Sequence, residues 1–219
     1  MSLTLYLHPL SSFCHKTLIA LYETGTPFTP HNIDLSNAEQ SAAFQKLWPV
    51  GKFPVLRDDA AGRTIPESTS IIEYLALHFP GNSKLIPDNA AAALDVRAQD
   101  RFFDLNVHLM MQKIIGDRIR PEGSKDPYGV DYARDKLRTA LTIVDKEMAT
   151  RTWAAGDSFS MADCAAAPTL FYTDMVVMPL AQDFPNAAAY LDRLTKRPSY
   201  ARALKEAEPY LHMVPRDRL

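Results

Sequence analysis

The chain has 219 residues, of which 47% are hydrophobic, and its 26 acidic side chains nearly balance its 24 basic ones. This length and composition allow one large buried core or two smaller ones. Because the chain has no basic excess and no apolar run of 18 residues, we expect neither a nucleic-acid partner nor a membrane-spanning segment.

Strand and helix patterns alternate through the first 80 residues. We expect, in order, a strand at 3–8, a helix at 13–22, a strand at 28–33, a helix at 38–47, a hairpin turning at 58–62 and a helix at 67–79. This order predicts an α/β domain over residues 1–80.

The residues after this domain are expected to be helical. Turn residues at 80–83 interrupt the pattern, so we place a linker at 81–90 and an all-α domain at 91–219. Its helices are expected at 90–119 with a break near Gly116, at 128–150, after Ser160, at 186–195 and at 199–206. Ser160 and Asp163 have the spacing of a capping box, and Pro168 should kink the helix that follows.

The two cysteines, Cys14 and Cys164, lie far apart in apolar surroundings. This favours free buried thiols in a reducing compartment, by default the cytoplasm, and the first residues lack the features of a secretory leader. The six histidines are scattered, and no cluster has metal-ligand spacing, so no metal site is expected.

Phe53 and Pro54 begin an apolar strand whose second residue is proline. A proline there predicts an edge strand or a cis peptide bond, because a central strand would lose a ladder hydrogen bond. Either arrangement would leave the backbone N–H and C=O of Phe53 free to pair with an extended peptide. An ordinary edge-strand proline with no ligand is the alternative.

Glu67 and Ser68 stand where the helix at 67–79 should begin. Unpaired N–H groups and the positive end of the helix dipole attract a carboxylate there, whereas the Glu67 carboxylate suits an ammonium group. A ligand with adjacent α-amino and α-carboxylate groups, as in a γ-glutamyl peptide, would satisfy both. The alternative is an ordinary helix cap.

Three segments together carry a family resemblance: Lys52-Phe53-Pro54-Val55, Glu67-Ser68 and residues 156–163. Taken with the domain order, they resemble the cis-proline strand, the γ-glutamyl pair and the helical-domain folding signature of cytosolic glutathione S-transferases, and the resemblance covers the whole chain. It implies a thioredoxin-like first domain, a helical second domain that contributes the electrophile site, a homodimer, and cytoplasmic detoxification with glutathione as co-substrate.

The resemblance also implies how the thiol is activated. In the serine-type classes, such as theta, tau and zeta, a serine between the first strand and the first helix donates its O–H to the glutathione thiolate. Ser11 matches that serine, and Ser12 is the runner-up one residue on. In the alternative reading both serines only cap the helix. The class of the chain stays open.

Cys14 supports a rival reaction, because thioredoxin-like oxidoreductases place Cys-x-x-Cys at this turn. Here Ser11 occupies the position of the attacking cysteine, and only Cys14, at the position of the buried resolving cysteine, remains. An accessible Cys14 would allow glutathione-dependent thiol oxidoreduction, which needs an exposed thiolate. A glutathione-dependent isomerase is a further alternative, although the residues around Ser11 depart from the serine-cysteine-serine signature of the zeta class.

The remaining site residues are assigned by position in the resembled fold. Lys52 would contact the glycine carboxylate of glutathione or a nearby carbonyl, and the alternative is a solvated turn lysine. A hydrophobic electrophile would be bound by the following residues: Leu10, Phe13, His108, Met111 and Tyr172, with Met110 and Tyr210 as further candidates. The alternative is that these residues only pack in the core. A protein can keep the fold and the site of its family without catalysing the reaction. A non-catalytic module that binds hydrophobic compounds or another protein therefore stays an alternative.

Overall fold

The protein divides into two compact units that do not follow the order of the chain. In the computed structural model, which describes residues 2–215, the first unit contains the chain up to Ile86 together with Ser199–Leu211. The second contains Pro87–Pro198 and the chain from His212. The first unit therefore includes a segment that the sequence analysis assigned to the helical domain at 91–219.

The first unit is built on a four-stranded sheet in the order β2-β1-β3-β4. The strands are β1 (Leu3–Leu7), β2 (Thr29–Asn32), β3 (Val55–Asp58) and β4 (Arg63–Pro66). β1 and β2 are parallel, and the other two pairs are antiparallel. The odd-numbered residues of β1 are buried leucines, which is the alternation that a half-buried strand requires.

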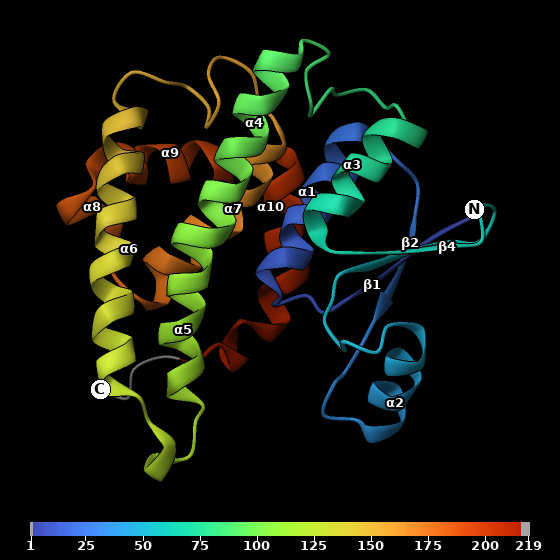
Figure 1. The fold of residues 1–219 in the computed structure, drawn as a ribbon, viewed down its shortest axis with the longest axis horizontal. Coiled ribbons are helices and arrows are strands. Elements are labelled where there is room, and N and C mark those ends of the chain that lie inside the picture. The colour runs from blue at the N-terminus through green and yellow to red at the C-terminus, as the bar shows by residue number, and fades with distance from the viewer. Residues whose placement is uncertain (1, 216–219) are drawn as a thin grey trace. The chain divides into compact units, whose positions relative to one another are not determined.

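Helices cover both faces of this sheet. α1 (Ser12–Thr24) and α3 (Ser68–His78) lie together on one face, and α2 (Ala38–Leu47) covers the other (Figure 1). α2 spans the residues predicted for it. α1 ends where Gly25 takes a left-handed conformation at φ 69°, which glycine adopts at little cost.

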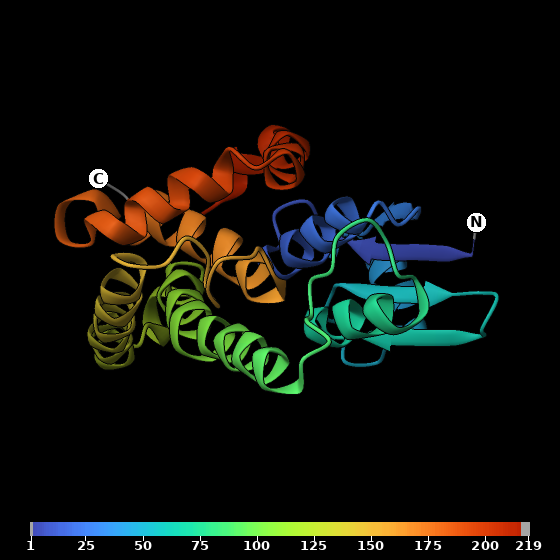
Figure 2. The same ribbon diagram turned by 90° about the horizontal axis from the view of Figure 1, so that it is seen from above.

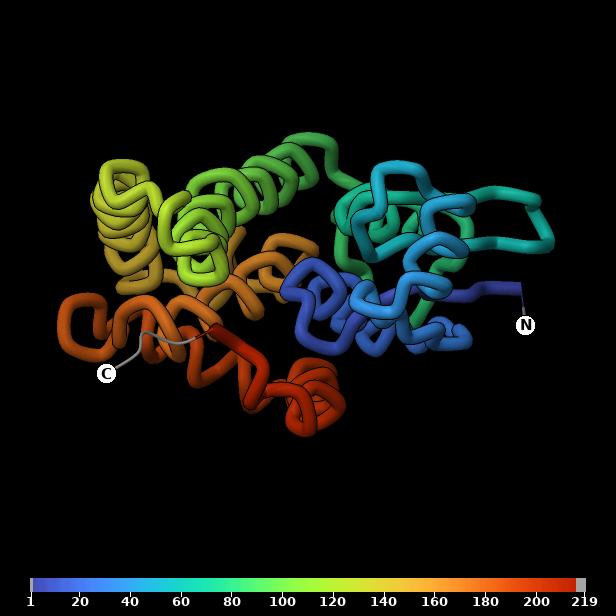
Figure 3. Tube along the Cα trace, turned by 90° about the horizontal axis from the view of Figure 1, so that it is seen from below, coloured from blue at the N-terminus to red at the C-terminus, as the bar shows by residue number. Residues whose placement is uncertain are grey.

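α10 (Pro198–Ala207) is followed by the short η3 (Glu208–Met213), and the part of these two elements from Ser199 to Leu211 completes the first unit. Figures 2 and 3 show the red end of the chain returning to the blue α1. Three contacts join α10 to α1: Tyr22 Oη donates to Glu206 Oε2 at 2.7 Å, Ser199 Oγ donates to Glu23 Oε1, and the rings of His15 and Tyr200 meet edge to face at 6.0 Å. These contacts explain why Ser199–Leu211 belongs to the first unit.

The second unit is helical. Its elements are α4 (Ala90–Phe102), η1 (Phe103–His108), α5 (Leu109–Arg118), η2 (Glu122–Ser124), α6 (Pro127–Met148), α7 (Met161–Val176), α8 (Leu180–Asp183) and α9 (Pro185–Thr195). α7 is buried along nearly its whole length and forms the centre of this unit. It continues as a helix through Pro168.

The long helix expected at 90–119 is irregular at a different place from the one predicted. Residues Phe103–His108 form a π-helical segment between α4 and α5, whereas Gly116 lies within α5. A glycine inside a helix costs only about 1 kcal/mol relative to alanine, which neighbouring turns can offset. The prediction of a break at Gly116 was therefore wrong.

The start of α7 is held by the capping box that the sequence predicted. Asp163 Oδ2 accepts from the backbone N–H of Ser160 at 2.8 Å and from Ser160 Oγ at 3.0 Å. Its other oxygen, Oδ1, accepts from the Ala154 N–H at 2.9 Å and from Tyr190 Oη at 2.5 Å. The carboxylate thus ties the preceding turn and α9 to the first turn of α7.

Candidate active site

Strand register brings the predicted segments of the first unit to one edge of the sheet. Tyr6 pairs with Val55 across β1 and β3, and Val55 pairs with Pro66 across β3 and β4. The residues that follow β1, precede β3 and follow β4 therefore lie at the same edge. These are the β1–α1 turn, the Phe53-Pro54 segment and the Glu67-Ser68 helix start.

The β1–α1 turn is fixed by backbone hydrogen bonds. The Ser11 N–H donates to the carbonyl oxygen of His8 at 3.0 Å, and the Leu10 N–H donates to His8 Nδ1 at 3.2 Å. His15 Nε2 lies 2.6 Å from the carbonyl oxygen of Pro9. Because a carbonyl only accepts, this nitrogen carries the hydrogen. The turn is thereby held from β1 and from α1.

Ser11 is the N-cap of α1, and its Oγ accepts the Cys14 N–H at 3.3 Å. This bond uses a lone pair of the hydroxyl rather than its hydrogen. Helix capping and hydrogen bonding to a ligand are consequently compatible roles for Ser11. Ser12, the runner-up, is buried, whereas Ser11 is half-buried.

Cys14 is fully buried on α1, and burial raises the pKa of its thiol to about 12 despite the opposing contact with Ser11. A thiol with this pKa is almost entirely protonated at neutral pH, and only the thiolate attacks disulfides. The structure therefore gives Cys14 the environment of a packing residue. Cys164 is also a free, buried thiol.

The Phe53–Pro54 peptide bond is cis, in agreement with one of the two sequence-based alternatives. The other alternative, an edge strand, was wrong: β3 pairs with β1 on one side and with β4 on the other. Pro54 does not remove a ladder hydrogen bond, because it precedes Val55, the first paired residue of the strand. Lys52 is exposed, and Phe53 is half-buried.

Glu67 is the N-cap of α3 and has a φ of 70°, the one positive φ among non-glycine residues in the described chain. A side chain in this region is strained, and such strain gathers at binding sites. The carboxylate of Glu67 is exposed and makes no capping hydrogen bond, whereas Ser68 is buried. Glu67 thus points to a ligand role better than to helix capping.

Two contacts link these segments directly. The rings of His8 and Phe53 stack at 6.0 Å between centroids, with 19° between their planes, which joins the β1–α1 turn to the cis-proline segment. Lys16 Nζ, buried on α1, donates to Thr69 Oγ1 at 2.8 Å, which joins α1 to the first turn of α3. The three segments are therefore mutually braced.

The residues predicted to bind a second substrate fall in both units. Leu10 and Phe13 are half-buried in the first unit. His108, Met111 and Tyr172 belong to the second unit and are 1%, 2% and 4% exposed, which is typical of core residues. Their assignment to a substrate site stays a prediction.

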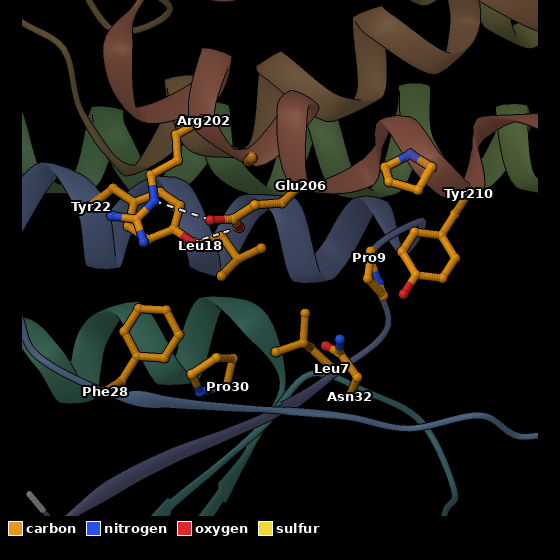
Figure 4. Close-up of a pocket in the computed structure, with 12 residues that line it drawn as sticks. Leu7, Pro9, Leu18, Tyr22, Phe28, Pro30, Asn32, Arg202, Glu206 and Tyr210 are labelled. Carbon is orange, nitrogen blue, oxygen red and sulfur yellow. Dashed lines mark hydrogen bonds and ion pairs between the residues drawn. The ribbon is translucent and has the colours of Figure 1, made fainter.

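A cavity of about 400 Å³ lies within the first unit, between α1, β2 and α10 (Figure 4). Its walls are mostly apolar, with Phe28 towards one end and Tyr210 towards the other. In the wall between Phe28 and Tyr210, the carboxylate of Glu206 accepts a hydrogen bond from Tyr22 Oη at 2.7 Å and one from Arg202 Nε at 3.0 Å. Burial, together with Glu206, raises the pKa of the Tyr22 phenol, so this hydroxyl stays protonated.

Sequence reasoning missed the residues that hold the β1–α1 turn, His8 and His15. Their partners are backbone groups of Leu10 and Pro9, and the sequence carries no motif for such bonds. The sequence feature that could have indicated them is their position: one histidine lies before, and the other after, the turn that carries the Ser11 hydroxyl. The contact between Tyr22 and Glu206 could not be predicted from the sequence because 184 positions separate the two residues.

Residues 2–215 contain neither a candidate metal site nor a candidate membrane span. No group of three or more histidine, cysteine or acidic side chains there could hold a metal ion. None of the helices in that range combines the length and apolarity needed to cross a membrane.

Comparison with known proteins follows the same division of the chain. Residues 5–83 match the family model of the glutathione S-transferase N-terminal domain, and residues 107–198 match that of the C-terminal domain. Among curated proteins, the chain is 26% identical to glutathione S-transferase GstB of Escherichia coli (strain K12) over 205 residues, which covers 90% of this chain and 95% of that protein. It is 27% identical to the stringent starvation protein A homolog of Coxiella burnetii, covering 97% and 96% of the two chains.

Among solved structures, the chain resembles a glutathione S-transferase from Methylobacillus flagellatus crystallised with glutathione bound. The TM-score is 0.84 at 26% sequence identity, and the match covers 92% of this chain and 98% of that one. The two domain models together account for most of the chain, and the structural match spans both units. The chain belongs to the glutathione S-transferase family.

Proposed function

We propose that the protein is a glutathione transferase that ionises the thiol of bound glutathione for attack on a hydrophobic electrophile. The observation that carries this proposal is the half-buried Ser11 hydroxyl, whose oxygen accepts the Cys14 N–H in a bond that does not use the hydroxyl hydrogen. It lies at the same sheet edge as the cis-proline segment and the α3 start.

Each end of glutathione has a matching group at this edge. The carboxylate of Glu67 takes the α-ammonium, and the N–H groups at the start of α3, with Ser68, take the α-carboxylate. The backbone of Phe53 pairs with the cysteinyl residue of the peptide, and the exposed Lys52 takes the glycine carboxylate. The cysteinyl sulfur is then directed towards the β1–α1 turn.

Ser11 stabilises the sulfur as an anion. A cysteinyl thiol with a pKa near 8.5 needs a decrease of about 2 units to be mostly ionised at pH 7, which corresponds to about 2.7 kcal/mol. Hydrogen bonds to a charged group supply roughly 1.5 to 3 kcal/mol each. The thiolate forms a bond to the electrophilic carbon, and the leaving group departs with the electron pair of the bond that breaks.

The acceptor is a hydrophobic electrophile. Leu10 and Phe13 flank Ser11 in sequence and are half-buried, so their apolar surface is available beside the thiolate. Three residues of the helical unit are also proposed to bind the electrophile: His108, Met111 and Tyr172. The small net charge of the chain, −2, gives no preference for an ionic acceptor, and the proposed compartment is the cytoplasm.

A thiolate titration tests the proposal. The absorbance of the bound thiolate is followed against pH in the native protein, in Ser11→Ala and in Ser12→Ala, with glutathione affinity measured separately. We expect the pKa of bound glutathione to be about 2 units below that of free glutathione in the native protein and in Ser12→Ala, and to rise to roughly the free value in Ser11→Ala. Binding of glutathione with an unshifted thiol in the native protein would refute the transferase mechanism.

A second candidate function is that of a binding module without transferase activity. It is favoured by the match to the stringent starvation protein A homolog, which is not named as a transferase and covers 97% of this chain. An unshifted thiol in the titration would support this candidate. Thiol oxidoreduction through Cys14 is disfavoured by the burial and the raised pKa of that thiol.

We further propose that the protein forms a homodimer through the second unit. Large apolar side chains are exposed along its helices: Leu94 on α4, Leu105 on η1, Leu109 on α5, and Tyr132 and Ile143 on α6. Leu105, Tyr132 and Ile143 line a shared hollow of about 210 Å³. A second copy of the chain would remove this surface from water.

Dimer formation is tested by substitution in this hollow. Ile143→Glu is expected to place a charge against apolar surface and to shift the protein towards the monomer by at least tenfold in dissociation constant. Sedimentation velocity over a concentration series measures the shift. Ile119→Glu, which changes an exposed side chain outside the hollow, serves as the control. A monomeric native protein would contradict the proposal.

A further inference from the structure

His8 contacts three segments around the proposed site. Its carbonyl oxygen accepts the Ser11 N–H, and its Nδ1 accepts the Leu10 N–H. Its ring stacks on Phe53 and meets the ring of Tyr210 edge to face at 5.7 Å. The side chain is thus placed between the turn that carries Ser11, the cis-proline segment and the residues that follow α10.

The hydrogen bond from Leu10 fixes the protonation of the ring. A backbone N–H is always a donor, so the Nδ1 that faces it must present a lone pair. In this arrangement His8 is neutral and carries its hydrogen on Nε2. A doubly protonated ring would have two donors and could not accept the Leu10 N–H.

We propose that His8 is a positioning residue for thiol activation: its neutral ring accepts the Leu10 N–H and thereby fixes the turn from which Ser11 presents its hydroxyl. This inference rests on the proposed function, and it assigns to His8 no contact with glutathione. Loss of the bond frees the Leu10 amide, and the turn then adopts several conformations of which only some direct Ser11 Oγ to the sulfur.

The groups around His8 favour the neutral ring. Partial burial lowers its pKa, and the carboxylate of Asp34, beyond β2, opposes this effect without cancelling it. From the other elements, the phenol of Tyr210 meets the ring edge to face, and a hydrogen bond from the backbone N–H of His8 lowers the pKa of the Cys14 thiol on α1, against the larger effect of burial. The Cys14 thiol stays protonated at neutral pH and brings no charge to the ring.

Two variants of His8 separate the effect of its hydrogen-bond acceptor from the effect of its aromatic ring. His8→Asn places Oδ1 near the position of Nδ1, so it keeps an acceptor that does not titrate but lacks the aromatic ring. His8→Phe keeps an aromatic ring between Phe53 and Tyr210 but has no acceptor. If the hydrogen bond positions the turn, His8→Asn should behave as the native protein at neutral pH, and His8→Phe should not.

The first measurement needs no glutathione. Amide hydrogen exchange of Leu10, followed by NMR in the ligand-free protein, should show a protection factor about tenfold lower in His8→Phe than in the native protein, and unchanged in His8→Asn. On acidification the Leu10 protection factor should fall in the native protein and stay constant in His8→Asn. A purely structural ring would not produce this pH dependence.

The second measurement is the pKa of bound glutathione. We expect it to rise by about one unit in His8→Phe and to stay at the native value in His8→Asn, with the affinity for protonated glutathione unchanged in both. Equal Leu10 protection in all three proteins overturns the proposal, as does an equal loss in both variants. A native thiol without a shifted pKa refutes the transferase function instead, and the exchange data still decide whether His8 holds the turn.

Discussion

Replacement of Asp163 by alanine is expected to lower the free energy of unfolding by about 4 kcal/mol, because four donors lose their shared buried acceptor. The donors are the N–H groups of Ala154 and Ser160 and the hydroxyls of Ser160 and Tyr190. Asp163 is fully buried, so water does not replace the carboxylate. The loss should detach the turn at Ala154 and α9 from the start of α7.

Urea unfolding measures this effect with a local probe. The chain has two tryptophans, Trp48 and Trp153, so a Trp48→Phe background leaves Trp153, next to Ala154, as the reporter of the second unit. Asp192→Ala is the matched control, since this exposed aspartate pairs with Lys196 on the surface and contributes at most about 0.5 kcal/mol. A change below about 1.5 kcal/mol for Asp163→Ala would contradict the proposed role of the capping carboxylate.

The protein is expected to lose stability as the pH falls below 6.5, through His15. Burial lowers the pKa of this imidazole from 6.5 to about 4. Between these two values the unfolded chain binds a proton that the folded chain excludes, so the folded state becomes less stable as the pH decreases. The loss amounts to about 2 kcal/mol between pH 7.5 and pH 5 and about 3 kcal/mol by pH 4.

His15→Gln isolates this contribution from that of the carboxylates. The glutamine amide can still donate to the carbonyl oxygen of Pro9, but it cannot take up a proton. With Trp153→Phe as background, the fluorescence of Trp48 reports on the first unit, and urea unfolding at pH 7.5 and pH 5 gives the two free energies. The decrease between these pH values should be about 2 kcal/mol smaller in His15→Gln. Parallel decreases in both proteins would show that His15 does not titrate as expected.

Local features of the fold could be predicted from the sequence because their causes are local. The turn residues at 58–62, the helix at 38–47 and the Ser160–Asp163 capping box each depend on residues a few positions apart. The cis bond before Pro54 was one of two alternatives, and the edge strand was the wrong one. Strand order decides between them, and a pattern within one strand does not contain that order.

The rest depends on contacts between distant segments. The π-helical turns at 103–108 and the return of α10 to the first unit follow from packing, which helical periodicity does not encode. At the candidate site, the serine and the helix start could be assigned by resemblance. The bonds from Leu10 to His8 and from His15 to Pro9 could not, because they depend on the three-dimensional course of one turn.

The membership of Ser199–Leu211 in the first unit has a consequence for biosynthesis. The ribosome releases the N-terminal end of a chain first, and domains generally fold as they emerge. Here the strands and helices up to Ile86 emerge early, but Tyr22 and Glu23 have no access to Glu206 and Ser199 until the last residues are made. The second unit, contiguous from Pro87 to Pro198 apart from its final residues, can therefore complete most of its core before the first unit does, so the unit that starts the chain is the later one to be finished.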